Sequence, residues 1–454
     1  MPHLWSILRQ KPARAVAQTG LRASATLPTS GTTSLDNSEG ASQAVAELLD
    51  TLDSALAQIS TEDDTRAQLT AQLEELDWKA SGYANSSLDF HSSREPWQRT
   101  PEMVNLVMKA WVCSEAVYER DTALSSDELT DSGLNIEWSL ASSANGNVKA
   151  TTLTTFVAPP SSDPSAKPTT YLIIAVRGSA STVDQLVNLH GEPRDASTLF
   201  QGIKVTPHSN DQTLKFQAHA GFLNSAKELL APVSAQIQKQ LNKGHNFKIL
   251  FTGHSAGGAV ATLLHLALRA KFADVSFSCI TFGCPPVAKV EGMKDSLALD
   301  HALEQAPILN IINEYDLVSR LGRGYVRSLI QLYGSKARDI PEESSWTDDE
   351  VVGKYWPLPT SDFEHIGSIV VLRTELPDLQ PDNMSASEVS TKVTAWSVTS
   401  EDLSDLIFCQ LQVHRRKYYR EKIEQLVNNN LSRIVAAPQP PSYAVATAFQ
   451  AVSK

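Results

Sequence analysis

The chain has 454 residues, of which 42% are hydrophobic and 20% charged, a globular balance that suits one large α/β domain with appended helices. Its formal net charge is −12, from 39 basic and 51 acidic residues, so no basic surplus is available to neutralise nucleic-acid phosphates. This balance excludes nucleic acid as an expected partner and disfavours strong electrostatic adhesion to anionic membranes.

The N-terminal part of the chain has two regions of different composition. The first 35 residues carry arginine and lysine but no acidic side chain, and they lack the apolar core of a secretory signal. We therefore expect residues 1–44 to be either a disordered tail or a mitochondrial presequence. Residues 45–99 contain leucines at three- and four-residue steps, which predicts a helical extension. We favour docking of its apolar stripe on the main domain over docking on another subunit.

The four cysteines, Cys113, Cys279, Cys284 and Cys409, have neither the spacing of a metal site nor that of a disulfide framework. Buried thiols are the simplest interpretation, and this usage favours a reducing compartment. We expect a cytoplasmic protein, with a mitochondrial location as the alternative, and we expect neither a metal ion nor another cofactor. No apolar run approaches the length needed to span a bilayer.

Residues 100–430 have the pattern of an α/β domain. A helix is predicted over 104–118, followed by half-buried strands over 134–140 and 149–157. Short apolar runs typical of central strands then alternate with helices. These runs cover residues 171–176, 247–252, 275–282 and 308–312. Strands that alternate with helices imply a mostly parallel central sheet flanked by helices.

The C-terminal part of this domain is less regular. Residues 333–362 are polar, and residues 376–395 are acidic and rich in Ser and Thr, which indicates a surface excursion. A long amphipathic helix over about 401–430 is predicted to close the domain. Residues 431–454 form a C-terminal tail.

Residues 253–258, Gly-His-Ser-Ala-Gly-Gly, follow an apolar strand and precede a helix rich in Ala and Leu. A serine on a tight strand-to-helix turn has its Oγ pushed clear of the backbone, which adopts strained dihedrals. Gly253 and Gly257 lack Cβ atoms, so strand and helix can approach closely. The helix N-terminus offers backbone N–H groups to a developing oxyanion. The pattern predicts a nucleophile elbow with Ser255 as the nucleophile.

Such a serine needs a base to remove its proton and an acid to orient that base. On scaffolds of this kind the acid follows the serine in the chain, and the histidine follows the acid. Asp316 comes just after the strand 308–312, at the edge where sites on such sheets gather, and we prefer it to nearby Glu314. Of the eleven histidines, His365 and His414 follow this acid. The residues alone leave the choice between these two open.

Several further motifs follow one another in order along residues 100–425. They are Val176-Arg177-Gly178-Ser179, His219-Ala220-Gly221-Phe222, Thr281-Phe282-Gly283-Cys284-Pro285, Asn313-Glu314-Tyr315-Asp316-Leu317-Val318, Phe363-Glu364-His365-Ile366-Gly367, and His414 with Tyr418 and Tyr419 behind it. Together with the elbow, they resemble the motifs of the class 3 lipases, fungal-type α/β-hydrolases that cleave acylglycerol and related esters.

The resemblance implies an α/β-hydrolase fold with a triad of Ser255, Asp316 and His414. It also implies that Ser179 and the backbone N–H of Ala256 form the oxyanion hole, and that His365 belongs to a non-catalytic strand entry. The implied activity is hydrolysis of carboxylic esters through an acyl-enzyme on Ser255. The partner would be a lipid or ester substrate, and peripheral contact with a lipid droplet or membrane surface is compatible with it.

Two departures from the family pattern follow the oxyanion segment. Gln185 and Asn188 stand where the family has Trp and then Asp. The lid segment, about 190–201, is charged and has only Leu199 and Phe200 as large apolar residues. Because lids that dock on lipid present an apolar face, this favours ester hydrolysis over interfacial lipase action.

Two alternatives to an acylglycerol lipase stay open. One is a phospholipase or small-ester esterase with the same triad. The other is a catalytically silent lipase-like protein that binds partners through its N-terminal helices. A scaffold has no need of serine, acid and histidine together, so the intact triad favours an enzyme. The sequence does not determine the oligomeric state.

Overall fold

The computed structural model describes residues 63–90, 94–118, 129, 132–142, 148–158, 168–178, 191–200, 215–244, 246–291, 306–335, 355–375 and 392–427. The chain divides into two compact units, Met1–Leu69 and Thr70–Lys454. Within the first unit, the described residues are the start of helix α3 (Asp63–Ser81). The expectations for residues 1–44 and 431–454 lie outside the described residues, and the predicted domain boundaries stay predictions.

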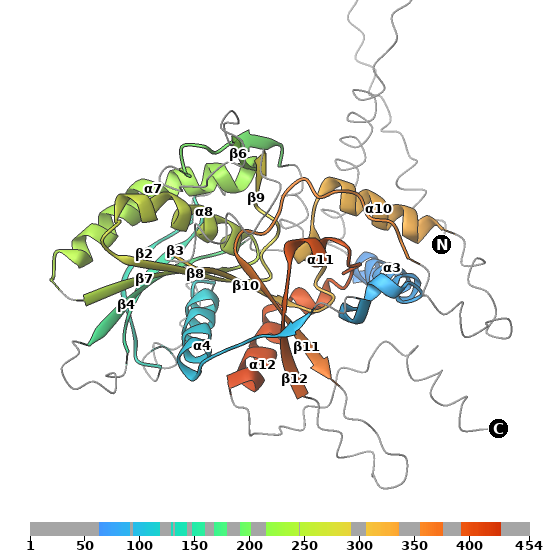
Figure 1. Cartoon of the computed structure of the whole chain (residues 1–454), viewed down its shortest axis with the longest axis horizontal. Helices are drawn as coiled ribbons and strands as arrows, with labels where there is room; N and C mark the ends of the chain where they lie inside the picture. Colours follow the sequence, from blue (N-terminus) through green and yellow to red (C-terminus); the bar gives the residue numbers. More distant parts are fainter. Residues whose placement is uncertain are drawn as a thin grey trace, which may run out of the picture. The chain divides into compact units, whose positions relative to one another are not determined.

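A nine-stranded sheet forms the centre of the second unit, in the order β1-β12-β11-β10-β8-β7-β4-β3-β2 (Figure 1). In that order the strands are Glu95–Pro96, Lys392–Val398, Ser368–Glu375, Ile308–Asn313, Ser276–Phe282, Asn246–His254, Thr169–Val176, Thr151–Val157 and Leu134–Leu140. The central strands, from β11 to β4, pair in parallel, whereas both margins pair antiparallel. The predicted α/β class is confirmed, with its parallel part at the centre.

Helices cover both faces of this sheet (Figure 1). Side chains of the central strands alternate between these two faces. On β4, Leu172 and Ile174 pack with helices α7 and α8, whereas Ile173 and Ala175 pack with α4 and α12. Burial on both faces explains why the strand reads as a continuous apolar run. The four helices are α4 (Pro101–Ala116), α7 (Ala220–Leu241), α8 (Ala256–Lys271) and α12 (Arg416–Val427).

Helix α4 begins three residues before the predicted start, for a local reason. The Thr100 side chain accepts a hydrogen bond from Met103 N, and Pro101 occupies the first turn, where its missing N–H costs nothing. The spacing of apolar residues predicts the buried face of a helix. It does not predict the polar capping residue, so the predicted start is too late.

The prediction of one long helix over 401–430 is wrong. The segment comprises α11 (Ser400–Ser404), a non-helical stretch over 405–411, the short 3-10 helix η7 (Gln412–His414) and α12. Four consecutive side chains, at 406–409, are buried, and one face of a helix could not bury them all. Gln410 then forms a parallel bridge with Asp316, so the chain passes the end of β10 before it reaches His414.

A second correction concerns residues 392–395, which we expected within a surface excursion. They belong to β12, which pairs antiparallel with β11 and buries Val393 and Ala395. Val393 and Ala395 pack in one core cluster, whereas Val398 and the partly buried Trp396 pack in another, so both faces of β12 are covered.

A separate three-stranded sheet lies over helix α7 in the order β5-β6-β9 (Figure 1). Its strands are Pro193–Asp195, Lys215–His219 and Ala288–Glu291. The expected lid segment, as far as it is described (191–200), supplies β5. Leu199 and Phe200 are buried, and the Phe200 ring stacks on Phe216 with centroids 4.3 Å apart. The large apolar side chains of this segment therefore face the core, and charged residues face solvent.

The part of α3 that belongs to the second unit packs on the C-terminal half of that unit. Leu76 and Ala80 lie in one core cluster with Leu317, Leu329 and Ile407. Docking of this part in cis agrees with our expectation for the extension. The elements that complete this region are η1 (Ala84–Ser86), η2 (Leu88–Phe90), η4 (Leu317–Arg320) and α10 (Arg323–Gly334). Among the described helices, none is both long and apolar enough to cross a membrane.

Candidate active site

Ser255 occupies the turn between β7 and α8 with φ 59° and ψ −134°, a left-handed conformation that is strained for a residue with a side chain. A Cβ on Gly257 would lie 2.2 Å from Val176 O, and one on Gly253 would lie 2.5 Å from the Gly257 carbonyl carbon. Only glycine fits at these two positions. The predicted strand-to-helix turn around Ser255 is therefore present.

The side chain of Ser255 is buried and makes no hydrogen bond to the end of helix α8. The backbone N–H of Ser255 donates to Phe282 O at 2.8 Å. The Oγ atom is buried and has no hydrogen-bond partner in the described part of the chain. No other side chain therefore competes with a substrate or a base for this hydroxyl in the described structure.

Asp316 is fully buried just beyond the end of β10. Its Oδ2 accepts hydrogen bonds from His414 Nδ1 at 2.8 Å and from the Tyr419 hydroxyl at 2.7 Å. Its Oδ1 accepts from Val318 N at 2.9 Å, which caps the short helix η4. A carboxylate with three donors has a single orientation, and that orientation points one oxygen at His414.

His414 is buried and presents its second ring nitrogen away from Asp316. Nε2 has no hydrogen-bond partner among the residues that the structure describes, the same condition as Ser255 Oγ. The ring stacks on His254 with centroids 4.6 Å apart, and His254 Nε2 lies 3.0 Å from His414 O. Burial first, and then the charge of His414, hold the pKa of His254 well below its usual value. His254 is therefore a neutral ring that holds the backbone of His414.

The rival residues are engaged elsewhere. His365 Nε2 donates to Ser319 O at 2.8 Å, and burial lowers its pKa to about 4. Glu314 accepts from Leu88 N at 3.1 Å and pairs with Arg373. The structure thus brings Asp316 and His414 together and leaves His365 and Glu314 outside that contact.

The predicted oxyanion hole is described only in part. Ala256 is the first residue of α8, directly after Ser255, so its N–H lies at the positive end of that helix. Ser179, Gln185 and Asn188 lie outside the described residues. The neighbouring Gly178 N donates to the Tyr118 hydroxyl at 3.0 Å.

A pocket that is partly open to solvent lies beside Ser255. Its lining is mostly apolar, with polar groups at His219, Arg323 and Asp362. The apolar lining residues include Phe222, Ala256, Pro285, Pro286, Val318, Leu321 and Phe363. A concave apolar pocket with few polar groups suits an acyl chain or another small apolar group.

Sequence reasoning missed two residues that pack on this site. Tyr419 donates to Asp316 and accepts from Asn313 N at 2.9 Å, a role that no local pattern on α12 reveals. Gly283 has φ 54°, and a Cβ there would lie 2.9 Å from Asp316 Oδ2 and 2.9 Å from His414 Cε1. The glycine in the motif 281–285 indicates that some group packs closely against the backbone there. It does not indicate that this group is the Asp316–His414 pair.

Within the described ranges, no group of three or more His, Cys, Asp or Glu side chains is arranged to hold a metal ion. The four cysteines are buried and unpaired, as expected, and burial raises the pKa of Cys113 and of Cys279 to about 12.

Residues 173–324 match the sequence profile of the lipase (class 3) family. The resemblance to the class 3 lipases is confirmed over that segment. The class 3 lipase segment contains Ser255 and Asp316, whereas His414 follows it. The chain is also 29% identical over 116 residues to secreted mono- and diacylglycerol lipase 1 of Fusarium solani, which aligns 26% of this chain with 30% of that relative.

Solved lipase structures are also similar to the chain. A native Rhizomucor miehei lipase propeptide complex is 20% identical and covers 70% of this chain and 80% of its own, with a TM-score of 0.42. A lipase from Rhizopus microsporus var. chinensis is 16% identical and covers 71% and 88% respectively, also with a TM-score of 0.42.

Proposed function

We propose that the chain is a lipase-type serine ester hydrolase that cleaves carboxylic esters through an acyl-enzyme on Ser255. One observation supports this most directly. Asp316 binds one nitrogen of His414 at 2.8 Å, while the other nitrogen and Ser255 Oγ are both buried without a hydrogen-bond partner in the described structure. A carboxylate, an oriented imidazole and a serine on a strained elbow are the groups that acyl transfer requires.

In the first half of the reaction, Ser255 Oγ attacks the acyl carbonyl carbon, and its proton passes to His414 Nε2. Asp316 holds the imidazole in one tautomer and stabilises the imidazolium. The N–H of Ala256 stabilises the oxyanion, and we propose Ser179 as the second donor. The tetrahedral intermediate collapses as His414 returns the proton to the leaving alkoxide, which departs as the alcohol.

In the second half, water attacks the acyl-enzyme and gives one proton to His414 Nε2. The intermediate collapses, the carboxylic acid leaves, and Ser255 regains its proton. The oxygen of Ser255 and the ring of His414 do not hydrogen-bond to each other in this structure. We expect that bond to form when substrate is bound, since catalytic hydrogen bonds often tighten in the complex.

The substrate we propose is an acylglycerol or a related ester with an apolar acyl chain. The mostly apolar pocket beside Ser255 supports this assignment. The similarity to a mono- and diacylglycerol lipase supports glycerides with a free hydroxyl as the first substrates to test. Because the described part of the lid segment is charged on its outer side, hydrolysis of dispersed esters is expected to need no lipid interface.

The test compares wild type, Ser255→Ala and Ser225→Ala on p-nitrophenyl esters of short and long chains. Ser225 is also a buried serine, on α7. We expect Ser255→Ala to lose at least about 10³-fold of kcat, and Ser225→Ala to keep it. Equal and negligible activity in all three proteins would favour the catalytically silent alternative. Parallel assays with mono-, di- and triacylglycerol and with a phospholipid separate the substrate classes.

A further inference from the structure

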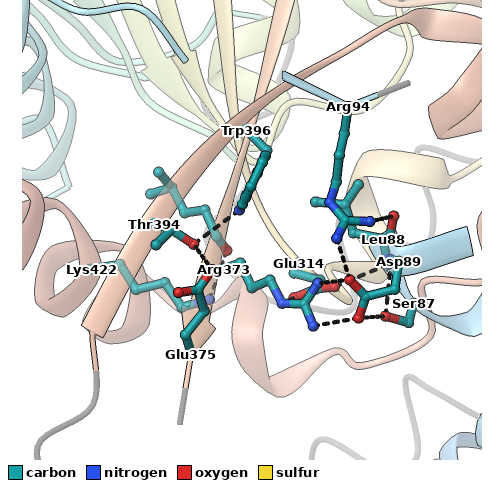
Figure 2. A network of polar contacts seen from close by, with 11 residues as sticks. Ser87, Leu88, Asp89, Arg94, Glu314, Arg373, Glu375, Thr394, Trp396 and Lys422 are labelled. Atoms are coloured by element: carbon teal, nitrogen blue, oxygen red, sulfur yellow. Dashed lines mark hydrogen bonds and ion pairs between the residues drawn. The ribbon is translucent and has the colours of Figure 1, made fainter. Parts of the chain in front are cut away.

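An ion pair lies beside the turn that carries the acid, and we infer that its members, the buried Glu314 and the partly exposed Arg373, are positioning residues of the reaction. This inference rests on the proposed function. Glu314 is two residues before Asp316 and is buried. Its Oε2 lies 3.6 Å from Arg373 Nε on β11, and its Oε1 accepts from Leu88 N at 3.1 Å (Figure 2).

Arg373 also connects the Glu314 carboxylate to the short helix η2, through Asp89. Its two terminal nitrogens donate to the two oxygens of Asp89, each at 2.6 Å (Figure 2). Asp89 also pairs with Arg94 at 2.6 Å, and Arg94 donates to Leu88 O at 3.1 Å. The bidentate geometry fixes the guanidinium in its plane, so its Nε faces Glu314 in one orientation.

The turn needs such anchors because its central residue is strained. Tyr315, between Glu314 and Asp316, has φ 71°, a region that residues with a side chain rarely adopt. Strained backbone persists only where the surroundings over-determine it. Tyr315 O accepts from Gln410 N at 2.9 Å on one side, and the Glu314 contacts hold the other. Release of Glu314 would let the turn relax and would carry Asp316 away from His414.

The charges that face Glu314 come from three neighbouring elements and from its own turn. They are Arg373 on β11, Lys422 on α12, Asp89 on η2 and the phenol of Tyr315. Burial raises the pKa of Glu314, and Arg373 is the largest opposing influence. Lys422 donates to Leu372 O at 3.0 Å, and burial lowers its pKa to about 8, against the attraction of Glu314 and Asp316. Arg373 and Lys422 are thus the two cations that act on the Glu314 carboxylate, and Arg373 is also bound by Asp89.

The variants Glu314→Gln and Arg373→Met test this role, with Glu115→Gln as a matched control. Glu115 is a second buried glutamate, on α4, and it pairs with Arg420 of α12 at 2.7 Å. We expect Glu314→Gln and Arg373→Met to lose roughly tenfold or more of kcat, because small displacements of reacting groups are costly. KM should stay unchanged, since neither side chain is among the described residues that line the pocket.

A pH profile separates positioning from general stability. When Asp316 no longer faces His414 squarely, the imidazolium is less stabilised, so the acid limb of kcat/KM should move to lower pH. The control Glu115→Gln should keep the wild-type limb, even if its Tm falls. The low-field proton resonance of the His414–Asp316 hydrogen bond should shift or broaden in Glu314→Gln and stay in the control.

Wild-type kcat and pH profile in folded Glu314→Gln, with Ser255→Ala inactive, would overturn this inference and leave the proposed function intact. Wild-type activity in Ser255→Ala would instead overturn the proposed function, and the inference with it. If Glu314→Gln does not fold, Asp89→Asn tests the inference instead. Asp89 is the more exposed partner of Arg373, so its replacement is expected to leave the fold intact. There we expect a smaller kcat loss and a limb shift in the same direction, and wild-type values would overturn the inference.

Discussion

The hydroxyl of Tyr419 lies 2.7 Å from the same Asp316 oxygen that His414 contacts at 2.8 Å. The hydroxyl donates there while it accepts from Asn313 N at 2.9 Å. Burial, reinforced by the Asp316 carboxylate, raises the pKa of Tyr419 well above its usual value, so the phenol keeps its proton and acts as a donor. One buried hydroxyl therefore links the last residue of β10 to the acid.

Tyr419→Phe should lower stability and activity together. It leaves the buried Asn313 N–H without an acceptor, which costs about 1–3 kcal/mol. It also removes one of the three donors that orient Asp316, so kcat should fall. Urea unfolding and initial rates on a p-nitrophenyl ester measure the two effects. Tyr418→Phe, at the neighbouring and less buried tyrosine, is the control and should match wild type in both.

Gly283→Ala should damage catalysis more than its backbone strain explains. The new Cβ would lie 2.9 Å from both Asp316 Oδ2 and His414 Cε1, so it must push the pair apart. A loss of kcat on the order of 10²-fold is expected. Gly244→Ala is the matched control, since Gly244 also has a positive φ, 79°, but no atom within 4 Å of an added Cβ. It should cost only about 1–2 kcal/mol of stability. Equal kcat values in the two variants would contradict the claim that a side chain at position 283 displaces Asp316 and His414.

His365 should make the folded protein less stable in acid. Burial lowers its pKa to about 4 from an ordinary 6.5, so the unfolded chain takes up a proton that the folded protein refuses. Stability is therefore lost as the pH falls from about 6.5 to about 4, by up to about 3 kcal/mol. His365→Gln keeps a donor for Ser319 O but does not titrate, so its unfolding free energy should fall less over this range. Parallel curves for variant and wild type in urea unfolding would refute this role.

The local parts of the fold could be predicted from the sequence because their signals are local. The central strands are buried on both faces and read as apolar runs, and the elbow needs glycine at positions 253 and 257. The segment 405–411 failed the same treatment, because Ile407 and Leu411 have the spacing of a helical stripe although the four adjacent side chains at 406–409 are all buried. Their burial comes from packing against α10 and the margin of the sheet, which sequence spacing does not report.

The sequence predicts which residues could act as nucleophile, acid and base. It does not predict the hydrogen bonds and ion pairs that hold these residues in place. His365 and His414 both follow Asp316 in the chain; the family resemblance favours His414, and in the structure their contacts with Ser319 O and Asp316 separate them. Glu314 read as a rival acid, whereas the structure turns it toward Arg373. Such contacts join side chains far apart in the sequence, so local spacing does not reveal them.

The most direct test of the account is covalent trapping of the nucleophile. A p-nitrophenyl phosphonate ester should form one adduct per chain, which peptide mass spectrometry maps to Ser255. Trapping should slow at least about 10²-fold in His414→Ala and stay at the wild-type rate in His365→Gln. An adduct at another residue, or trapping at Ser255 that is indifferent to His414, would contradict the assignment of Ser255 and His414 as nucleophile and base.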